Sequence, residues 1–481
     1  MYDVLIVGCG IVGAATAFEL SKYRLSVAVA EKENDVACGA TKANSAILHA
    51  GYDPRPGTLM ARLNVRGSAL AEKLARALAV PYRKTGSLVL ALSEEELPML
   101  ERLYAQGMEN GVPGLRLLSR EETLAREPAL SHEVRGALFA PSAAIVSPWE
   151  FCLALAETAV RNGVSLHRSC EVTGIEKKPE GGFAVHTSDG TFEARFLVNA
   201  AGVHAAEIQA LAGEREFQIL PSRGEYCLLD KSQGRLVQSV VFQCPTRNGK
   251  GVLVAPTTGG NLIVGPTAAL VDNGENTATT AEGLRQVRET ALRSAPGIRF
   301  GETIRTFAGV RALSDQEDFI IGESKSAGGL LNLAGIKSPG LSSAPAIAEL
   351  AAEKLREMGL SLVPKEHFCM ERPVTRMKML SPEEQRARIA GNPSFGRVIC
   401  RCETVTEGEI LEALHSPIPP VSIDGVKRRC GAGMGRCQGG FCLPRVADLL
   451  SRELGIPMED IPLDKAGSAF LTGDTKEGGR G

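Results

Sequence analysis

The sequence predicts an α/β fold whose amino-terminal part is a doubly wound, largely parallel sheet. Residues 3–7 are a short apolar run typical of a buried strand, and a Gly-x-Gly-x-x-Gly pattern follows at residues 8–13. Residues 12–21 have helical periodicity, and residues 25–30 form a second apolar run that ends at Glu31. A strand, a glycine-rich turn, a helix and a second strand open this fold, whose ligands bind at the carboxyl ends of the strands.

The remaining elements follow from the periodicity of apolar residues. Short apolar or alternating runs predict strands, and apolar residues that recur every three to four positions predict helices. The predicted strands are residues 87–92, 183–187, 196–199, 251–254, 262–264 and 319–321. The predicted helices are residues 58–77, 95–107, 148–162, 280–294 and 344–358.

The order of these elements predicts one domain inserted into another. We expect residues 1–78, 145–215 and 305–358 to form the doubly wound domain. Residues 79–144 and 216–304 would form the inserted domain, whose antiparallel sheet would contact the substrate.

The pattern changes after residue 358. Three prolines interrupt a charged, poorly periodic stretch, so residues 359–395 are predicted to be a linker over the surface. Residues 396–456 are predicted to be a small helical domain that contains clustered cysteines, with helices at 407–415 and 444–454. Residues 457–481 are predicted to be a tail, disordered over its last ten residues.

Composition excludes some classes of protein. The chain has 481 residues, more than one core usually supports, and therefore predicts two or three domains. Its net charge of -2 gives no basic field for nucleic acid. The sequence has no apolar stretch long enough to span a membrane directly and no basic start typical of a signal peptide, so we expect a cytoplasmic protein.

The glycine pattern predicts a dinucleotide site. Gly8 permits a tight turn, Gly10 lets the backbone approach a pyrophosphate, and Gly13 allows close packing of helix on sheet. The amino terminus of the helix then faces the anion. Glu31 follows Gly13 by 18 positions and can accept hydrogen bonds from ribose hydroxyls.

The glycine pattern alone does not distinguish FAD from NAD, but two features favour FAD. The sequence has no second such pattern for a nicotinamide nucleotide, and residues 39–46 form a loop of small and hydroxyl side chains that includes Thr41, Asn44 and Ser45. Residues 335–340 precede a predicted helix and could offer backbone amides to the flavin ring. The alternative for this segment is an ordinary turn between strand and helix.

Five of the twelve cysteines fall within one short segment, which favours metal ligation over disulfides in a reducing compartment. Cys400 and Cys402 form one close pair, and Cys437 and Cys442 form another, so the two pairs can enclose one centre. Thiolates suit both zinc and iron–sulfur clusters, although zinc sites more often use Cys-x-x-Cys. Cys430 is either a fifth candidate ligand or a free thiol.

Taken together, the motifs resemble those of the D-amino-acid-oxidase-like FAD-dependent oxidoreductases. Within that family the chain most resembles the large FAD subunit of anaerobic glycerol-3-phosphate dehydrogenases, over about residues 1–455. The motifs are Gly8 to Gly13, Glu31, Thr41 to Ala46 with His49, Val198-Asn199-Ala200-Ala201-Gly202, Thr306-Phe307-Ala308-Gly309-Val310-Arg311, and Gly335 to Gly340.

The cysteine segment is similar to the bacterioferritin-associated-ferredoxin-like domain, in which such cysteines hold a two-iron, two-sulfur (2Fe-2S) cluster. This resemblance implies that Cys400, Cys402, Cys437 and Cys442 are the ligands. Nearby glycines would let the backbone donate hydrogen bonds to the sulfurs. These glycines are Gly433, Gly435, Gly439 and Gly440.

The resemblance also implies three catalytic residues. His49 would be the base, since it is the only one of the seven histidines inside a cofactor motif. Arg311 matches the position where relatives place an arginine that faces substrate and flavin, and a guanidinium grips phosphate or carboxylate. Lys337 would stabilise negative charge on the reduced flavin, or else cap a turn.

Further residues complete the predicted site. Arg223, Tyr226, Lys250 and Arg305 are candidates for binding an anionic substrate, and each could equally be a solvated side chain. The remaining cofactor-binding candidates are Val172, Ala201, Gly202, Gly335, Gly340 and Leu341.

The sequence therefore predicts an FAD-dependent dehydrogenase for a small anionic hydroxy compound, and the resemblance implies glycerol 3-phosphate. Electrons would pass through the cluster to a partner redox subunit or carrier, or into a quinone pathway, and the protein could be peripheral to the membrane through that partner. One alternative is a dehydrogenase for L-2-hydroxyglutarate, another 2-hydroxy acid or an amino acid. A second alternative is a non-catalytic relay or sensor that holds both groups.

Overall fold

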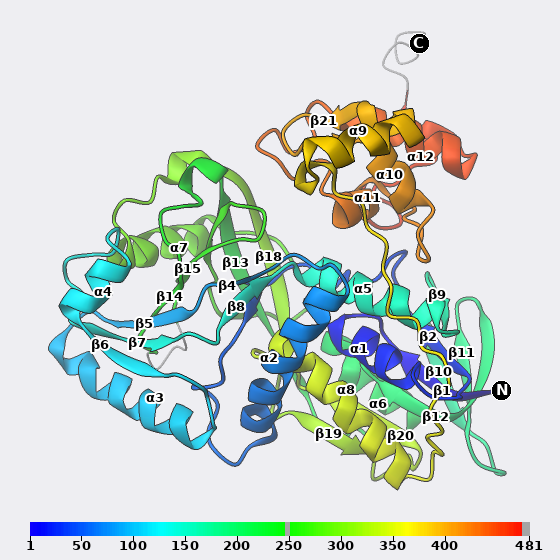
Figure 1. Cartoon of the computed structure of the whole chain (residues 1–481). Coiled ribbons are helices and arrows are strands. Elements are labelled where there is room, and N and C mark those ends of the chain that lie inside the picture. Colours follow the sequence, from blue (N-terminus) through cyan, green and yellow to red (C-terminus); the bar gives the residue numbers. More distant parts are fainter. Residues whose placement is uncertain (246–250, 474–481) are drawn as a thin grey trace, which may run out of the picture.

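The computed structural model describes residues 1–245 and 251–473, and the predicted disordered residues 474–481 lie outside this part (Figure 1). Two sheets lie side by side in the larger part of the molecule. A small helical domain from the carboxyl-terminal part of the chain lies above them, joined by an extended segment (Figure 1). In the described ranges, no helix is both long and apolar enough to cross a membrane.

The first sheet has a parallel core. Its strands lie in the order β9 (Ser165–His167), β2 (Val27–Ala30), β1 (Tyr2–Val7), β12 (Gly190–Asn199) and β20 (Leu330–Ala334), each parallel to its neighbour. Because these strands run the same way, their carboxyl ends meet at one edge, which is where ligands bind in such sheets. The predicted α/β class with a doubly wound domain is confirmed.

Alternating side chains of β1 bury both faces of this sheet. Val4 and Ile6 belong to a core shared with α1 (Ile11–Leu20), α5 (Pro148–Arg161), α8 (Gly340–Glu357) and α2 (Leu59–Ala77). Leu5 and Val7 belong to a second core, on the other face. That face is covered by α6 (Ala205–Ala212) and by the antiparallel strands β10 (Val172–Lys177) and β11 (Phe183–Thr187), while β19 (Ile320–Glu323) pairs with the outer strand β20.

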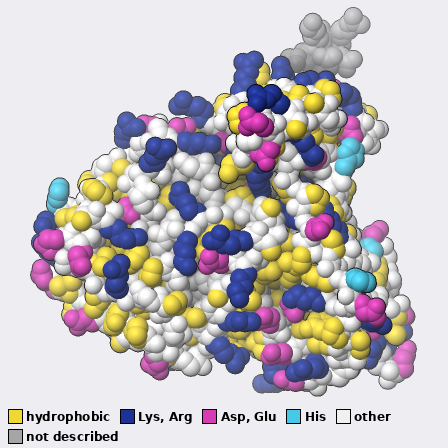
Figure 2. Space-filling view, in the orientation of Figure 1, with side chains coloured by type: hydrophobic (Ala, Val, Ile, Leu, Met, Phe, Trp, Pro, Cys, Tyr) yellow, Lys and Arg dark blue, Asp and Glu magenta, His cyan; other side chains and the backbone are white. Residues whose placement is uncertain are grey.

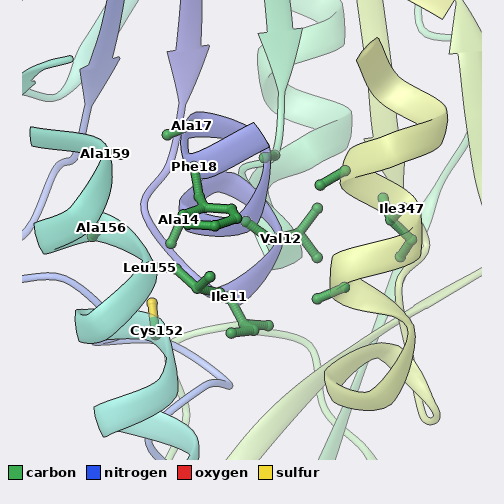
Figure 3. Packing of buried hydrophobic residues seen from close by; sticks show 14 of the residues in the cluster. Ile11, Val12, Ala14, Ala17, Phe18, Cys152, Leu155, Ala156, Ala159 and Ile347 are labelled. Carbon is green, nitrogen blue, oxygen red and sulfur yellow. The ribbon is translucent and has the colours of Figure 1, made fainter. Parts of the chain in front are cut away.

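Helix α1 lies between α5 and α8 (Figure 3). Small residues such as Ala14 and Ala156 let the helices approach closely, and Phe18 fills the space between them. Close packing also requires Gly13, because a Cβ there would lie 2.0 Å from the carbonyl oxygen of Gly8. The helix that follows the first glycine turn is therefore held rigidly against the sheet.

The second sheet is antiparallel apart from one parallel pair, β14 with β5. It is built mainly from the segments predicted to be inserted, and it is covered by α7 (Ala281–Ser294), α3 (Leu97–Glu109) and α4 (Arg120–Arg126). Its strands in order are β17 (Ala269–Leu270), β13 (Ile219–Leu229), β16 (Leu262–Gly265), β15 (Leu253–Pro256), β14 (Val240–Gln243), β5 (Ser87–Ala91), β7 (Gly136–Ala140) and β6 (Arg116–Ser119). A small sheet of β3 (Ile47–Leu48), β8 (Ala144–Val146) and β4 (Tyr82–Lys84) completes this part of the molecule.

Strand β18 (Thr303–Ser314) departs from the predicted division. The sequence assigned residues from 305 onward to the doubly wound domain, but β18 pairs along its length with β13 in the second sheet. Arg223 and Tyr226 were expected on strands of the inserted domain and lie on β13, whereas β18 was not predicted as a strand, since its burial does not alternate regularly. Arg311 therefore belongs to the second sheet.

The carboxyl-terminal domain is helical, as predicted. Its core joins α10 (Glu407–Leu414), α11 (Ile423–Cys430) and α12 (Leu443–Leu454), beside the short strands β21 (Val398–Cys400) and β22 (Val405–Thr406). Helix α11 was not predicted because it has only eight residues, several of them charged.

Two segments with no predicted structure are ordered. The predicted linker contains helix α9 (Pro382–Gly391), which begins with a capping box between Ser381 and Glu384. The described part of the predicted tail packs on the domain, where Ile461 is fully buried and Asp464 forms ion pairs. Local apolar periodicity gave no signal for either segment.

A buried ion cluster docks this domain on the first sheet. Asp35, on the loop after β2, is fully buried and accepts two hydrogen bonds of 2.9 Å from Arg429 and one of 2.9 Å from Arg428. Burial raises the pKa of Asp35, but the attraction and hydrogen bonds of Arg429 and Arg428 outweigh this effect and hold the pKa below its ordinary value. Asp464 extends the cluster by pairing with Arg428 at 2.8 Å and Lys42 at 2.6 Å.

The domain also touches the second sheet. Glu403 pairs with Lys231 at 2.8 Å, and Gln438 accepts a hydrogen bond of 3.3 Å from Arg305 of β18. The cysteine-bearing loops are thus fixed against both sheets.

We expect Asp35→Asn to lower the free energy of unfolding of the carboxyl-terminal domain by about 3–5 kcal/mol, because it leaves the buried Arg429 without a carboxylate and Arg428 with Asp464 alone. Urea unfolding and hydrogen exchange of α11 would measure the loss. The contribution of Asp35 is complete above about pH 4, near the pKa of an unfolded aspartate, and is lost as the pH falls below that value.

Asp464→Asn is the matched control, since the Asp464 side chain is 25% exposed and should contribute less than about 1 kcal/mol. Equal effects of the two substitutions would contradict the role given to Asp35.

Candidate active site

One cavity of about 2130 Å³ extends across the junction of all three parts of the molecule. Gly8 and Glu31 line one end, at the carboxyl edge of the parallel strands. Arg311 of the second sheet lines another part, and Gly431 and Met434 of the carboxyl-terminal domain also contribute. The predicted cofactor motifs and the cysteine domain therefore face one space.

The glycine turn fits a pyrophosphate. Gly8 has φ +95°, and a Cβ at that position would lie 2.8 Å from the carbonyl oxygen of Ala200. The hydroxyl of Thr41 accepts a hydrogen bond of 3.0 Å from the Ile11 amide and lies 3.4 Å from where a Cβ on Gly10 would sit. The backbone is thus open to a ligand at the amino terminus of α1, as predicted.

Glu31 is buried at the end of β2, within the same cavity. Its carboxylate accepts hydrogen bonds from the amides of Cys9 at 2.6 Å and Glu33 at 3.0 Å. Burial raises the pKa of Glu31 to about 7, against the lowering effect of these two amides. The carboxylate thus lies at the carboxyl end of β2, where an acidic residue of a dinucleotide site is expected.

The loop after Glu31 is shaped by its own side chains. Asn44 donates to the carbonyl of Thr41 at 2.8 Å and accepts from the amide of Ala46 at 2.7 Å, which holds Ala46 at φ +60°. Ser45 lies 3.3 Å from the hydroxyl of Tyr226. Thr41, Asn44 and Ser45 all line the cavity, but Asn44 acts chiefly as a brace for the loop.

The structure separates the other predicted cofactor residues into two groups. Gly335 is not among the lining residues that the structure describes; it has φ +61°, and a Cβ there would lie 2.8 Å from the Ser314 hydroxyl. Gly335 therefore has a structural role in the turn before α8, just as Gly13 has a structural role in the packing of α1. The lining residues are Val172, Ala201, Gly202, Gly340 and Leu341, the last two at the amino terminus of α8.

His49 lies in the cavity just after β3. Its backbone amide donates to the hydroxyl of Ser342 at 2.7 Å, and its carbonyl accepts from the side chain of Asn64 at 2.7 Å. The ring stacks on Phe242, with 5.7 Å between centroids, and Nε2 lies 3.3 Å from the hydroxyl of Ser338. The imidazole is therefore oriented from several sides, as a positioned acid or base requires.

The register of β13 and β18 decides which arginine reaches the cavity. Ser222 is paired with Arg311, and Tyr226 with Phe307, so these side chains share one face of the sheet. Arg311 donates to the carbonyl of Thr267, and the rings of Tyr226 and Phe307 stack with centroids 4.8 Å apart. Both predicted residues, Arg311 and Tyr226, line the cavity.

Arg223 lies on the opposite face, where it pairs with the buried Glu225 at 3.2 Å, so it does not fulfil its predicted role. The one-residue offset from Ser222 reverses its direction, because side chains alternate along a strand. Arg305 reaches the cavity but is hydrogen-bonded to Gln438 of the cysteine loop. Lys250 lies outside the described residues.

Lys337 lines the cavity in the turn before α8, beside residues that the sequence did not single out. Ser338 and Ser342 orient His49, and Phe242 stacks on it. Ser338 lies within the glycine-rich segment 335–340 and Ser342 lies just after it, and this proximity was the only feature of the sequence that pointed to them. Nothing in the sequence pointed to Phe242, since its contact depends on how the two sheets meet.

The four predicted cysteine ligands form two pairs. The sulfurs of Cys402 and Cys437 are 3.5 Å apart at the surface, whereas Cys400 and Cys442 are buried and hydrogen-bonded to each other. The thiol of Cys442 and the amides of Gly433 and Glu403 lower the pKa of Cys400 to about 6. Amides thus approach the sulfurs, as predicted for Gly433.

The two pairs together supply four thiolates. Two pairs at two points match a cluster whose two irons each take two thiolates. Cys430 is partly buried at the cavity wall, desolvation raises its pKa to about 12, and its thiol donates to the Val426 carbonyl, so it has the character of an unreactive thiol.

Comparison with known proteins gives two matches along the chain. Residues 3–354 match the family of FAD dependent oxidoreductases, and residues 398–452 match the BFD-like [2Fe-2S] binding domain. A glycerol 3-phosphate dehydrogenase from Caloramator mitchellensis is 47% identical over 477 residues, which cover 99% of each chain. The mitochondrial L-2-hydroxyglutarate dehydrogenase of Mus musculus is 31% identical over 410 residues, covering 73% of this chain and 88% of its own.

A solved structure is similar as well. The dithionite-reduced L-alpha-glycerophosphate oxidase from Mycoplasma pneumoniae, with FAD bound, superposes with a TM-score of 0.73 and is 33% identical. The match covers 78% of this chain and 99% of that one.

We expect the affinity of the apoprotein for FAD to rise as the pH increases through about 7 and then to level off. The ribose hydroxyls donate to the ionised carboxylate of Glu31, which is largely protonated below its raised pKa. The effect approaches tenfold per pH unit on the acid side. Titration of apoprotein into FAD, followed by flavin fluorescence, measures it.

Glu31→Gln should bind FAD more weakly, by about 1.5–3 kcal/mol, with no pH dependence over this range. A pH profile unchanged by Glu31→Gln would contradict the assignment.

Substitution of the cysteines should separate ligands from the free thiol. Cys437→Ser is expected to abolish bound iron and acid-labile sulfide, because one iron loses a thiolate, whereas Cys430→Ser should retain both in full. Iron analysis and the visible spectrum of purified protein test this. Loss of the cluster in Cys430→Ser, with retention in Cys437→Ser, would contradict the ligand set.

Proposed function

This chain belongs to the family of FAD dependent oxidoreductases, and we propose that it is a dehydrogenase that oxidises glycerol 3-phosphate to dihydroxyacetone phosphate. One observation carries the proposal. The full-length match to a glycerol 3-phosphate dehydrogenase coincides with a single cavity that contains the dinucleotide turn, an oriented histidine and an arginine. The matched families bring FAD and a 2Fe-2S cluster as cofactors.

His49 is the proposed base. Its Nε2 faces the cavity side of the turn at Ser338 and can take the proton of the substrate hydroxyl. Stacking on Phe242 and the contact of Nε2 with the Ser338 hydroxyl limit rotation of the ring, while the hydrogen bond to Ser342 fixes the backbone of His49. FAD, when bound, supplies a two-electron acceptor for the hydride that leaves the carbon atom bearing this hydroxyl.

Arg311 is the proposed anchor for the phosphate. A planar guanidinium binds two phosphate oxygens at once, which fixes the orientation of the substrate as well as its charge. Its hydrogen bond to the Thr267 carbonyl and its position above Gly224, where a Cβ would lie 2.2 Å from its nitrogen, hold the side chain along the sheet. Tyr226 and Lys337 line the same cavity and would contribute a hydroxyl donor and a second positive charge.

The cysteine domain supports a protein acceptor in place of oxygen. About a fifth of this chain has no counterpart in the Mycoplasma pneumoniae oxidase, whereas the Caloramator mitchellensis dehydrogenase matches over 99% of its length. The cluster, when bound, supplies a one-electron carrier, which suits delivery to a redox partner.

We place this reaction in the cytoplasm, with the protein either free or attached to the membrane through its partner. All twelve cysteines lie in the described ranges, and none of them forms a disulfide there. Free thiols are usual in a reducing compartment.

Anaerobic addition of glycerol 3-phosphate to the holoenzyme should bleach the flavin absorbance. His49→Gln should slow the bleaching by about 10²–10⁴-fold at unchanged FAD content, because the hydroxyl proton loses its acceptor. His132→Gln, an exposed histidine outside the cavity, is the matched control and should leave the rate unchanged.

The same experiment distinguishes the alternatives. Bleaching by L-2-hydroxyglutarate or an amino acid, but not by glycerol 3-phosphate, would reassign the substrate. Bleaching by dithionite alone would indicate a non-catalytic relay and overturn the proposal.

A further inference from the structure

We propose that the exposed edge of the iron–sulfur centre is a docking surface for an acidic protein that carries one electron at a time. We call this surface the carrier face and define it as Arg401, Cys402, Cys437, Phe441 and Arg445. The inference names the kind of partner and rests on the proposed function for the source of the electrons.

The two cysteine pairs give the centre an inner and an outer end. Cys400 and Cys442 are 1% and 2% exposed, whereas Cys402 and Cys437 are exposed. Gly433, whose amide donates to the sulfur of Cys400, belongs to the turn whose residues line the cavity. The cavity lining also includes Glu403 and Gln438, which are next to Cys402 and Cys437 in the sequence. Electrons from the cavity can therefore enter the centre and leave through the exposed sulfurs.

An aromatic ring lies beside the outer pair. Phe441 is 41% exposed and is the only exposed phenylalanine of the fifteen in the chain, all of which lie in the described ranges. Its ring is held by the guanidinium of Arg401 at 4.3 Å and that of Arg445 at 5.0 Å from the centroid. A rigid aromatic residue flanked by arginines is typical of the centre of a protein interface.

The charge of the carrier face is not balanced. Arg397, Arg436 and Arg452 of the same domain each pair with a carboxylate, whereas Arg401 and Arg445 have no ion pair among the described residues. Lys and Arg side chains are also prominent on the visible surface of this domain (Figure 2). Two unpaired cations beside an electron exit favour a partner with carboxylates around its redox group.

The surface is small, as expected for an encounter between redox proteins. Such interfaces bury little area and depend on electrostatic steering for their rate of association. Two arginines would attract an anionic membrane only weakly, because each charge contributes little and most anchors of this kind use four or more. A carrier protein is therefore the favoured partner.

The electron balance is simple. Oxidation of the secondary alcohol to the ketone releases two electrons, so two molecules of a one-electron carrier are reduced for each substrate oxidised. At the carrier face the centre is oxidised by one electron as the carrier is reduced by one. No covalent bond forms, and the two protons leave to solvent.

The test uses holoenzyme with FAD and cluster, reduced anaerobically by dithionite so that it does not depend on the substrate. Two probes are mixed with it: the acidic haem domain of cytochrome b5 and the basic cytochrome c. The second-order rate of haem reduction and the dissociation constant, from surface plasmon resonance, are measured at low and high salt.

For the wild type we expect rapid reduction of cytochrome b5, slowed by about tenfold or more at high salt. Arg401→Glu with Arg445→Glu should lower the rate and the affinity for cytochrome b5 by about tenfold or more, and should improve both for cytochrome c. The pair Arg401→Lys with Arg445→Lys, which keeps the charge, should restore most of the rate. Arg215→Glu, an exposed arginine between α6 and β13, is the matched control and should change nothing.

Each variant is first checked for iron content and for the electron paramagnetic resonance signal of the reduced cluster, and Phe441→Ser provides a second route should charge reversal impair loading. The proposal is overturned if loaded variants reduce and bind cytochrome b5 like the wild type, or if Arg215→Glu has the same effect. Tighter binding to phosphatidylserine vesicles than to cytochrome b5 would also overturn it, in favour of a membrane surface.

The experiment distinguishes failure of the proposed function from failure of the docking proposal. A protein that glycerol 3-phosphate cannot reduce, but that passes dithionite electrons through the carrier face, would lose its substrate assignment and keep its docking surface.

Discussion

The buried carboxylate of Asp35 holds the molecule together at its most important junction. It pairs with Arg428 and Arg429 in a site with almost no access to water, so separation of the carboxyl-terminal domain would leave Asp35 and Arg429 unpaired. Asp35 lies on the loop after Glu31, and α11 leads directly to Gly431 at the cavity wall. The same ion cluster therefore fixes the cysteine-bearing domain next to the loop that follows Glu31, and it holds Gly431 at the wall of the cavity.

The second constraint is the register of two strands. Strands β13 and β18 pair over their whole length, with Ser222 opposite Arg311. Arg311 therefore lies on the cavity face of the sheet, whereas Arg223, one residue after Ser222, lies on the other face and pairs with Glu225. The first sheet acts in a complementary way: parallel strands bring Gly8 and Glu31 to one edge although they are far apart in sequence. The active site forms where the edge of one sheet meets the face of the other, and the helical domain covers it.

Features that depend on local backbone chemistry could be predicted from the sequence. The positive φ of Gly8, the carboxylate at the end of a strand and the spacing of four cysteines each leave a pattern within a few residues. Features that depend on distant partners could not: Asp35 is one aspartate among many until α11 lies against it, and Arg223 differs from Arg311 only through strand register. Helix α9 and the packed residues after 457 lacked apolar periodicity because their partners are mostly polar or lie in other segments.

In the proposed mechanism, the docked carboxyl-terminal domain receives electrons from the cavity through its cysteine centre. Rapid mixing of the holoenzyme with glycerol 3-phosphate, followed by freezing and electron paramagnetic resonance, measures when the cluster is reduced relative to flavin bleaching. In the wild type we expect cluster reduction to follow flavin bleaching without delay. In Asp35→Asn we expect bleaching to keep its rate while cluster reduction lags. Identical timing in both proteins, or a cluster that stays oxidised in the wild type, would contradict the proposed mechanism.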